Sequence, residues 1–275
     1  MKPFKIFVKR RALLMAVGAG LLLSSCAVQP PVTMSAEVRV MTSGAFTAPY
    51  KELVPMFEKE TGHKVLSAYG ASMGNAPDAI PVRLERGEAA DIVIMAGAAL
   101  DDLIKKGKVM PGSRVDLVRS TIGFAVRSGA PKPDISTMDK LKKTLLDAKS
   151  IAYSASASGV YFSTEMLQKM GIAEQVLPKA KRILSERVGT VVARGDAELG
   201  LQQVSELIPI AGIDYIGPLP PEVQQTTLFS AGIVVGAKEP QAARALIKFF
   251  TSTTAAPIIS RSGLEPMTQK SSLAL

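Results

Sequence analysis

Cysteine and histidine are almost absent from this sequence, which has one of each, Cys26 and His63, among 275 residues. A lone cysteine cannot form an internal disulfide, so no such cross-link stabilises the fold. Transition-metal sites need clusters of histidine and cysteine, and the serine-type triads need a histidine beside the nucleophile. His63 lies in TGHKV, a predicted helix-to-strand turn, at the sheet end opposite the carboxyl ends of the strands. We therefore expect no metal site and no histidine-based catalysis.

Strong positive charge is also missing once the first residues are set aside. Residues 1–25 hold five of the 33 lysines and arginines and no acidic residue, so 28 basic and 24 acidic side chains remain in the rest. Such a mild, scattered excess does not favour nucleic-acid binding. No long apolar run follows the first 23 residues, and motifs for nucleotide phosphates or a nucleophilic serine elbow are lacking.

The first 25 residues have the pattern of an export signal. The basic segment MKPFKIFVKRR precedes a short apolar run over residues 12–23, and LSSCA follows. The LSSC motif that ends at Cys26 resembles a bacterial lipobox, whose cysteine carries a lipid. The alternative is an ordinary signal cleaved near Ala27 or Ala36. We expect a periplasmic protein that, if lipidated, is anchored to the membrane by the lipid alone.

Beyond the signal, predicted strands and helices alternate. EVRVMTSG, HKVLSAYG and ADIVIMAG have strand patterns, and helical patterns stand between or after them. This rhythm predicts an α/β fold with helices covering parallel sheets. Two long predicted strands, Ser120–Arg127 and Thr226–Ala237, favour two lobes between which the chain crosses twice. The expected division is a tether at 26–35, one lobe from 36–119 and 227–275, and a second lobe from 120–226.

Three predicted strands end in segments of small residues, TSG, GASMG and SASASG. Ligands of open α/β sheets bind beyond the carboxyl ends of the strands, where free N–H groups at helix starts attract anions. Ordinary helix capping is the alternative for each segment. Taken together, the segments predict an anion cleft lined by Ser43, Gly44, Ser72, Met73, Ser156, Ser158 and Gly159.

An irregular joint of 11 residues, Gly70–Ile80, separates one of these strands from a helix that we expect to begin at Pro81. Arg83 falls in the first turn of that helix, where the helix dipole disfavours a cation unless an anion compensates. A bound carboxylate would compensate, so Arg83 is a candidate clamp. The alternative is a solvated surface arginine.

Four further polar residues are candidates for the same cleft. Arg194 is a second possible clamp. Gln202 and Gln203 are adjacent in a predicted strand, so at most one of them faces the ligand, and we assign Gln202. Tyr161 follows the SASASG segment and can point its hydroxyl into the cleft, with packing in the core as the alternative.

Long stretches of the chain resemble the type II periplasmic solute-binding proteins, above all their molybdate-binding branch. VMTSGAFTAPYKELVPMFEKETGHKV, RLERGEAADIVIMAG and KKGKV carry the similarity. The resemblance implies two α/β lobes that close over an anion, with two crossover strands as hinge. Ala45 stands where the molybdate binders carry a serine, and residues 75–82 resemble an insertion. Both departures favour a ligand larger than a tetrahedral oxyanion.

A closer resemblance is to the bacterial periplasmic aconitate isomerases. SMGNAPDAIPVRLERGEAADIVIM, IAYSASASGVYFSTEM, VVARGDAELGLQQVSEL and QAARALI match in order across most of the chain. The resemblance implies a cofactor-free isomerase that converts trans-aconitate to cis-aconitate by an allylic proton shift. Without a suitable histidine, a desolvated carboxylate, a lysine or a tyrosine must move the proton. We expect Tyr161 in that role, with Arg83, Ser72, Ser158 and Gly159 as carboxylate clamps.

The alternative is a protein that binds its ligand without converting it. A lipidated solute-binding protein would deliver a tricarboxylate or a molybdate-like oxyanion to the permease of an ABC transporter. The lipobox and the scaffold favour this alternative, whereas the specific match to the isomerases favours an enzyme. In both cases the expected partner is a small anion.

Overall fold

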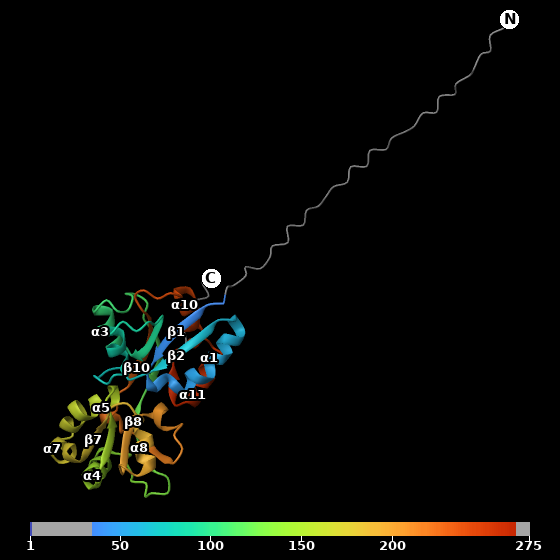
Figure 1. Ribbon diagram of the computed structural model, residues 1–275. Helices are drawn as coiled ribbons and strands as arrows, with labels where there is room; N and C mark the ends of the chain where they lie inside the picture. Colours follow the sequence, from blue (N-terminus) through green and yellow to red (C-terminus); the bar gives the residue numbers. More distant parts are fainter. Residues whose placement is uncertain (2–34, 268–275) are drawn as a thin grey trace, which may run out of the picture. The chain divides into compact units, whose positions relative to one another are not determined.

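Two β-sheets with helices packed around them make up the part of the chain that the structure describes (Figure 1). It is a computed structural model that describes Met1 and residues 35–267; the predicted signal, Cys26 and the tether up to residue 34 lie outside the described residues. The first sheet has the strand order β11-β4-β10-β3-β1-β2 and the second the order β7-β6-β8-β5-β9. The predicted two-lobed α/β architecture is confirmed.

The first sheet is built mainly from the first third of the chain and its end. Strands β1, β2 and β3 run parallel, and β10 pairs antiparallel with β3 and β4. Helix α1 buries one face against this sheet and ends at Gly62, whose φ of 74° suits glycine. The elements are β1 (Glu37–Thr42), η1 (Gly44–Phe46), α1 (Thr47–Thr61), β2 (Lys64–Tyr69), α2 (Ile80–Glu85), β3 (Ile92–Ala96), α3 (Gly97–Lys105), β4 (Val115–Ser120), β10 (Thr227–Ile233), α10 (Pro240–Phe250), α11 (Ala256–Arg261) and β11 (Leu264–Pro266).

The second sheet is formed by the middle of the chain, and Figure 1 shows α4, α5, α7 and α8 around it. No helix in the described ranges is both long enough and apolar enough to cross a membrane. The elements are β5 (Ile122–Arg127), α4 (Met138–Asp147), β6 (Ile151–Ser154), α5 (Ala157–Tyr161), η2 (Phe162–Met166), α6 (Leu167–Lys169), α7 (Ala173–Val176), η3 (Leu177–Lys179), β7 (Ala180–Ile183), α8 (Val188–Arg194), β8 (Leu199–Gln203), α9 (Val204–Leu207), β9 (Ile213–Pro218) and η4 (Pro221–Val223).

The crossing strand predicted at Ser120–Arg127 corresponds to β5 of the second sheet, and a separate strand, β4 of the first sheet, ends where it begins. Strand β4 was not predicted, because its sequence VDLVRS carries charges inside an apolar pattern. Oδ1 of its Asp116 accepts from the hydroxyl of Ser230 in β10, which is distant in the sequence, at 2.6 Å, and from the guanidinium of the nearby Arg114 at 2.9 Å. Contacts distant in sequence therefore make this charged segment a strand.

Two glutamine side chains of the second lobe form hydrogen bonds to the two segments, here called crossings, in which the chain passes from one sheet to the other. The Ser120 hydroxyl at the end of β4 donates to Oε1 of Gln203 at 2.7 Å, and Nε2 of Gln203 donates to the Thr227 hydroxyl at the start of β10 at 3.4 Å. Gln224 accepts from the N–H of Ile122 and donates to its carbonyl oxygen, both at 2.9 Å. The two crossings are thus tied together, which fixes where the lobes meet.

Asp91 is a buried carboxylate that joins three segments of the first lobe. It accepts hydrogen bonds from the backbone N–H of Arg39 in β1 at 2.7 Å and from those of Lys238 and Glu239 before α10 at 2.6 and 3.1 Å. Its side chain is 1% exposed. Removing the carboxylate would leave these N–H groups without a partner, which is costly in a buried position.

We expect Asp91→Ala to lower the free energy of unfolding by roughly 2–4 kcal/mol, because it orphans buried donors to a charged acceptor. Urea unfolding followed by circular dichroism measures the change. The matched control is Asp102→Ala, which removes only an exposed pair with Lys105 at 3.5 Å and should cost less than about 1 kcal/mol. Equal losses in the two variants would contradict the role given to Asp91.

Candidate functional site

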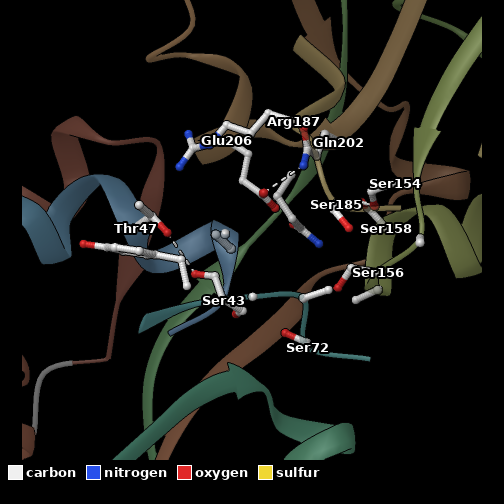
Figure 2. Close-up of a pocket in the computed structure, with 18 of the residues that line it drawn as sticks. Ser43, Thr47, Ser72, Ser154, Ser156, Ser158, Ser185, Arg187, Gln202 and Glu206 are labelled. Carbon is white, nitrogen blue, oxygen red and sulfur yellow. Dashed lines mark hydrogen bonds between the residues drawn. The ribbon is translucent and has the colours of Figure 1, made fainter. Parts of the chain in front are cut away.

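A pocket of about 290 Å³ lies at the carboxyl ends of β1, β2, β6 and β8, and both lobes supply its wall. Its size is near the lower end of the range for small-molecule sites, roughly 300–1,000 Å³. The lining is rich in hydroxyl groups, which Figure 2 shows pointing toward a common space. The hydroxyl residues are Ser43, Thr47, Ser72, Ser154, Ser156, Ser158 and Ser185. Such a lining suits a small polar ligand.

Ser43 presents a buried hydroxyl without a hydrogen-bond partner among the described residues. It follows β1 directly, its N–H donates to the carbonyl of Ile94 at 2.8 Å, and its own carbonyl accepts from the Thr47 hydroxyl at 3.2 Å. The backbone is therefore satisfied while Oγ is not, although the residue is only 2% exposed. A buried polar atom without a partner is unfavourable, so a ligand atom is the natural partner.

The other hydroxyl groups are held in place but keep hydrogen-bonding capacity. Oγ of Ser72 accepts from the N–H of Ala96 at 2.9 Å, which leaves its hydrogen free to donate. The Oγ atoms of Ser154 and Ser158 lie 3.1 Å apart. Ser156 stands at the N-cap of α5 but its side chain does not cap that helix. Donors from both lobes thus face the pocket.

Arg187 gives the pocket a positive charge that no acid of the described residues neutralises in an ion pair. It immediately precedes α8, at the end of the pocket where Glu206 lies (Figure 2). A second cation, Lys51, lies over the ring of Tyr69 with Nζ 5.5 Å from the ring centroid. Guanidinium groups bind carboxylates through paired hydrogen bonds, so Arg187 is a suitable anchor for an anion.

Glu206 is one of three acidic residues that line the pocket, together with Asp78 and Glu186. It comes from α9, and Nε2 of Gln202 donates to its Oε2 at 2.7 Å, while Oε1 of Gln202 accepts from the N–H of Val188 at 3.1 Å. Gly44 of the other lobe lies so close that a Cβ there would overlap the carboxylate. Desolvation raises the pKa of Glu206 from 4.5 to about 7, and Arg187 opposes that shift.

Residues 38–265 match the family model described as bacterial extracellular solute-binding protein. The chain belongs to this family. Membership implies a periplasmic location, whereas lipidation of Cys26 stays a prediction.

Two known proteins and one solved structure are similar to this solute-binding protein. An aconitate isomerase of Pseudomonas sp. is 48% identical over 92% of this chain and 96% of the relative. The molybdate-binding protein ModA of Azotobacter vinelandii is 29% identical over 91% and 96%. The solved structure of the Azotobacter vinelandii periplasmic molybdate-binding protein covers 82% of this chain and 98% of its own, with a TM-score of 0.66 at 20% identity. The chain is a homologue of an aconitate isomerase on a solute-binding-protein scaffold, as its motifs predicted.

The structure brings most of the small predicted site residues together but leaves two of them aside. Met73 packs beside an apolar cluster of the first lobe instead of lining the pocket. Gly159 lies inside α5, where a side chain would overlap the carbonyl of Ser154, so its role is to let the helix approach β6. The predicted residues that line the pocket are Ser43, Gly44, Ser72, Ser156, Ser158 and Gln202.

Both predicted arginine clamps lie outside the pocket lining and are neutralised by acids. Arg83 donates through Nε and Nη2 to the carboxylate of Glu88, and through Nη1 to the carbonyl of Tyr69 at 3.2 Å. Arg194 is exposed and pairs with Glu186 and Asp196 at 2.7 and 2.9 Å. We expected a bound anion to compensate the positive charge of Arg83 in the first turn of its helix. Glu88, five residues later, compensates that charge instead.

Tyr161, the predicted acid–base group, points into the core of the second lobe. Its hydroxyl donates to the carbonyl of Val223 at 2.8 Å, and burial raises its pKa further from neutrality. Arg187 and Glu206, by contrast, line the pocket but were not among the predicted site residues. The rule that ligands gather beyond strand ends points to Glu206, which stands three residues after β8 in GLQQVSEL.

We expect Glu206→Gln to raise the free energy of unfolding of the ligand-free protein at about pH 8 by on the order of 1–3 kcal/mol. The carboxyl ionises near 4.5 in the unfolded chain and near 7 when folded. Between these values the native state binds more protons, so the carboxylate's penalty grows as the pH rises and is complete above 7.

Denaturant unfolding at about pH 8 and again at about pH 4, where the carboxyl is protonated in both states, measures the effect. The gain should be present at the higher pH and absent at the lower one. The exposed Glu60 offers a matched control in Glu60→Gln, for which we expect no such difference. A gain of the same size at both pH values would contradict desolvation as its cause.

Proposed function

We propose that this protein is a cofactor-independent isomerase that interconverts trans- and cis-aconitate by an allylic proton shift. The observation that carries the proposal is the pocket, which places a desolvated carboxylate and an arginine without an ion pair to any described residue around one set of hydroxyl donors. The 48% identity to an aconitate isomerase over most of both chains supports it.

The pocket is suited to a substrate with several carboxylates. Arg187 can bind one carboxylate through two parallel hydrogen bonds, and the hydroxyl groups of Ser43 and Ser72 can donate to another. Ser156 faces the same space from the second lobe. Because these groups come from both lobes, a bound polycarboxylate bridges them.

The reaction requires little of the protein beyond proton transfer and charge stabilisation. A C–H bond of the methylene breaks, and its electron pair forms a new double bond to the central carbon. The pair of the old double bond then binds a proton at the former alkene carbon, so atoms and oxidation states balance. Negative charge spreads onto the neighbouring carboxylate in between, where preorganised donors stabilise it. The guanidinium of Arg187 and the serine hydroxyl groups provide such donors.

A second candidate is a binding protein that delivers an anion to an ABC permease. The family match and the two molybdate-binding relatives, at 29% and 25% identity, favour it. The same pocket would then retain its ligand without converting it, and a lipid on Cys26 would hold the protein at the membrane.

Proton nuclear magnetic resonance separates the two candidates. The purified protein is incubated with trans-aconitate, and the isomerase produces cis-aconitate until the same mixture is reached from either isomer. Tight binding measured by calorimetry with no conversion in either direction would reject the isomerase and support the binding protein.

We expect Arg187→Ala to weaken binding of trans-aconitate by roughly 10- to 100-fold, because it removes charge-assisted hydrogen bonds to a carboxylate. Isothermal titration calorimetry measures the affinity. The matched control is Arg83→Ala, whose guanidinium is bound by Glu88 outside the pocket lining and whose loss should leave the affinity unchanged. If Arg83→Ala weakened binding more than Arg187→Ala, the ligand would instead bind at the segment Gly70–Ile80 before α2.

A further inference from the structure

Building on the proposed isomerase function, we propose that Glu206 is the acid–base residue that carries the proton between the two allylic carbons of the substrate. The sequence predicted this role for Tyr161, but the hydroxyl of Tyr161 faces the core, whereas Glu206 lines the pocket.

The other ionisable groups of the pocket lining are unsuited to the task. Arg187 does not give up its proton in proteins. Glu186 is bound by both terminal nitrogens of Arg194, at 2.7 and 3.0 Å. Asp78 is half-buried, and its Oδ1 accepts from the hydroxyl of Ser185 at 3.2 Å.

Two more ionisable groups, Lys51 and Tyr69, stack on each other at an exposed position, with 5.5 Å between Nζ and the ring centroid. A group that exchanges a proton with carbon needs to lie in a shielded part of the site, where its pKa can approach the working pH. Of the five ionisable residues that line the pocket beside Glu206, Lys51, Tyr69 and Glu186 are exposed, Arg187 keeps its proton, and Asp78 is already bound by Ser185.

Glu206 is held by one of its two oxygens. Oε2 accepts from Nε2 of Gln202 at 2.7 Å, and Gln202 is itself fixed by the N–H of Val188. Oε1 accepts no hydrogen bond from another described residue, so it is available to a substrate. The dashed line in Figure 2 marks the contact with Gln202, with Arg187 beside it.

The first lobe completes the placement of this carboxylate. Gly44 lies against it without a side chain, and the neighbouring Ser205 donates from Oγ to the carbonyl of Ala45 at 2.8 Å. The carboxylate is therefore positioned by both lobes, at the point where a bridging ligand would lie.

The electrostatic surroundings of Glu206 match a group that must take up and release a proton near neutral pH. Burial raises its pKa to about 7 and Arg187 lowers it. The other charged groups of the pocket are Lys51, Asp78 and Glu186. Since a base works in its ionised form, activity should rise as the pH increases through about 7.

The proposed step is balanced. The Glu206 carboxylate removes a proton from the substrate methylene, whose C–H electron pair becomes the new double bond. The former double bond supplies the pair that accepts the proton back from the Glu206 carboxyl at the former alkene carbon. Arg187 stays protonated and stabilises the charge that the substrate carries in between. Enzyme and substrate end with the same number of protons as at the start.

Glu206→Gln tests the assignment, because it keeps the shape and the acceptor for Gln202 while removing the base. We expect the rate constant kcat to fall by about 10²- to 10⁴-fold. Affinity for trans-aconitate should be unchanged or tighter, since a negative charge is removed. In deuterium oxide the wild type should introduce deuterium at the allylic carbons, and the variant should lose this exchange to the same degree.

Tyr161→Phe is the matched control, since it removes a hydroxyl bound to the core, and its kcat should stay within about threefold of the wild type. A Glu206→Gln variant that keeps more than about a tenth of kcat would overturn the role of Glu206. A large loss in Tyr161→Phe, with Glu206→Gln active, would return the role to Tyr161. A wild type without turnover would reject the proposed function itself, and this assignment with it.

Discussion

The contact of α9 with η1 joins the two lobes at the wall of the pocket. Ser205 donates to the carbonyl of Ala45 at 2.8 Å, and the next residue, Glu206, faces Gly44. A side chain at position 44 would overlap the carboxylate of Glu206, so a residue larger than glycine does not fit there. Because Gln203 also binds both crossings, the same few residues set the junction of the lobes and the wall of the site.

This arrangement combines two opposing demands in one place. A carboxylate shielded from water lowers stability when it is ionised, yet shielding brings its pKa near 7, where proton exchange with carbon is feasible. Arg187 opposes part of that cost and offers a carboxylate of the ligand a guanidinium that has no ion pair with another described residue. The hydroxyl of Ser43, which has no hydrogen-bond partner in the described part of the chain, is a second unfavourable element that a ligand would satisfy. Unsatisfied groups of this kind are expected where binding, and not folding, is served.

The sequence motifs predicted the scaffold and several of the small residues that line the pocket. Strand ends rich in glycine and serine placed Ser43, Ser72, Ser156 and Ser158 at one pocket, because neighbouring parallel strands end at one edge of a sheet. The two predicted arginine clamps, in contrast, do not line the pocket. Arg83 was chosen for its position in a helix, but Glu88 neutralises it, and such pairing depends on side-chain conformations that spacing does not reveal.

The alternation of strands and helices, the two-lobed fold and the family could be predicted from the amino-acid sequence, since they follow from local hydrophobic patterns and from long matching motifs. Which ionisable groups line the pocket became evident only from the three-dimensional arrangement. Tyr161 and Glu206 both follow strands that end at the pocket, and one turns into the core while the other meets Gly44 of the opposite lobe. Their surroundings come from residues far away in the chain, and desolvation, which sets the pKa of Glu206, is a property of those surroundings.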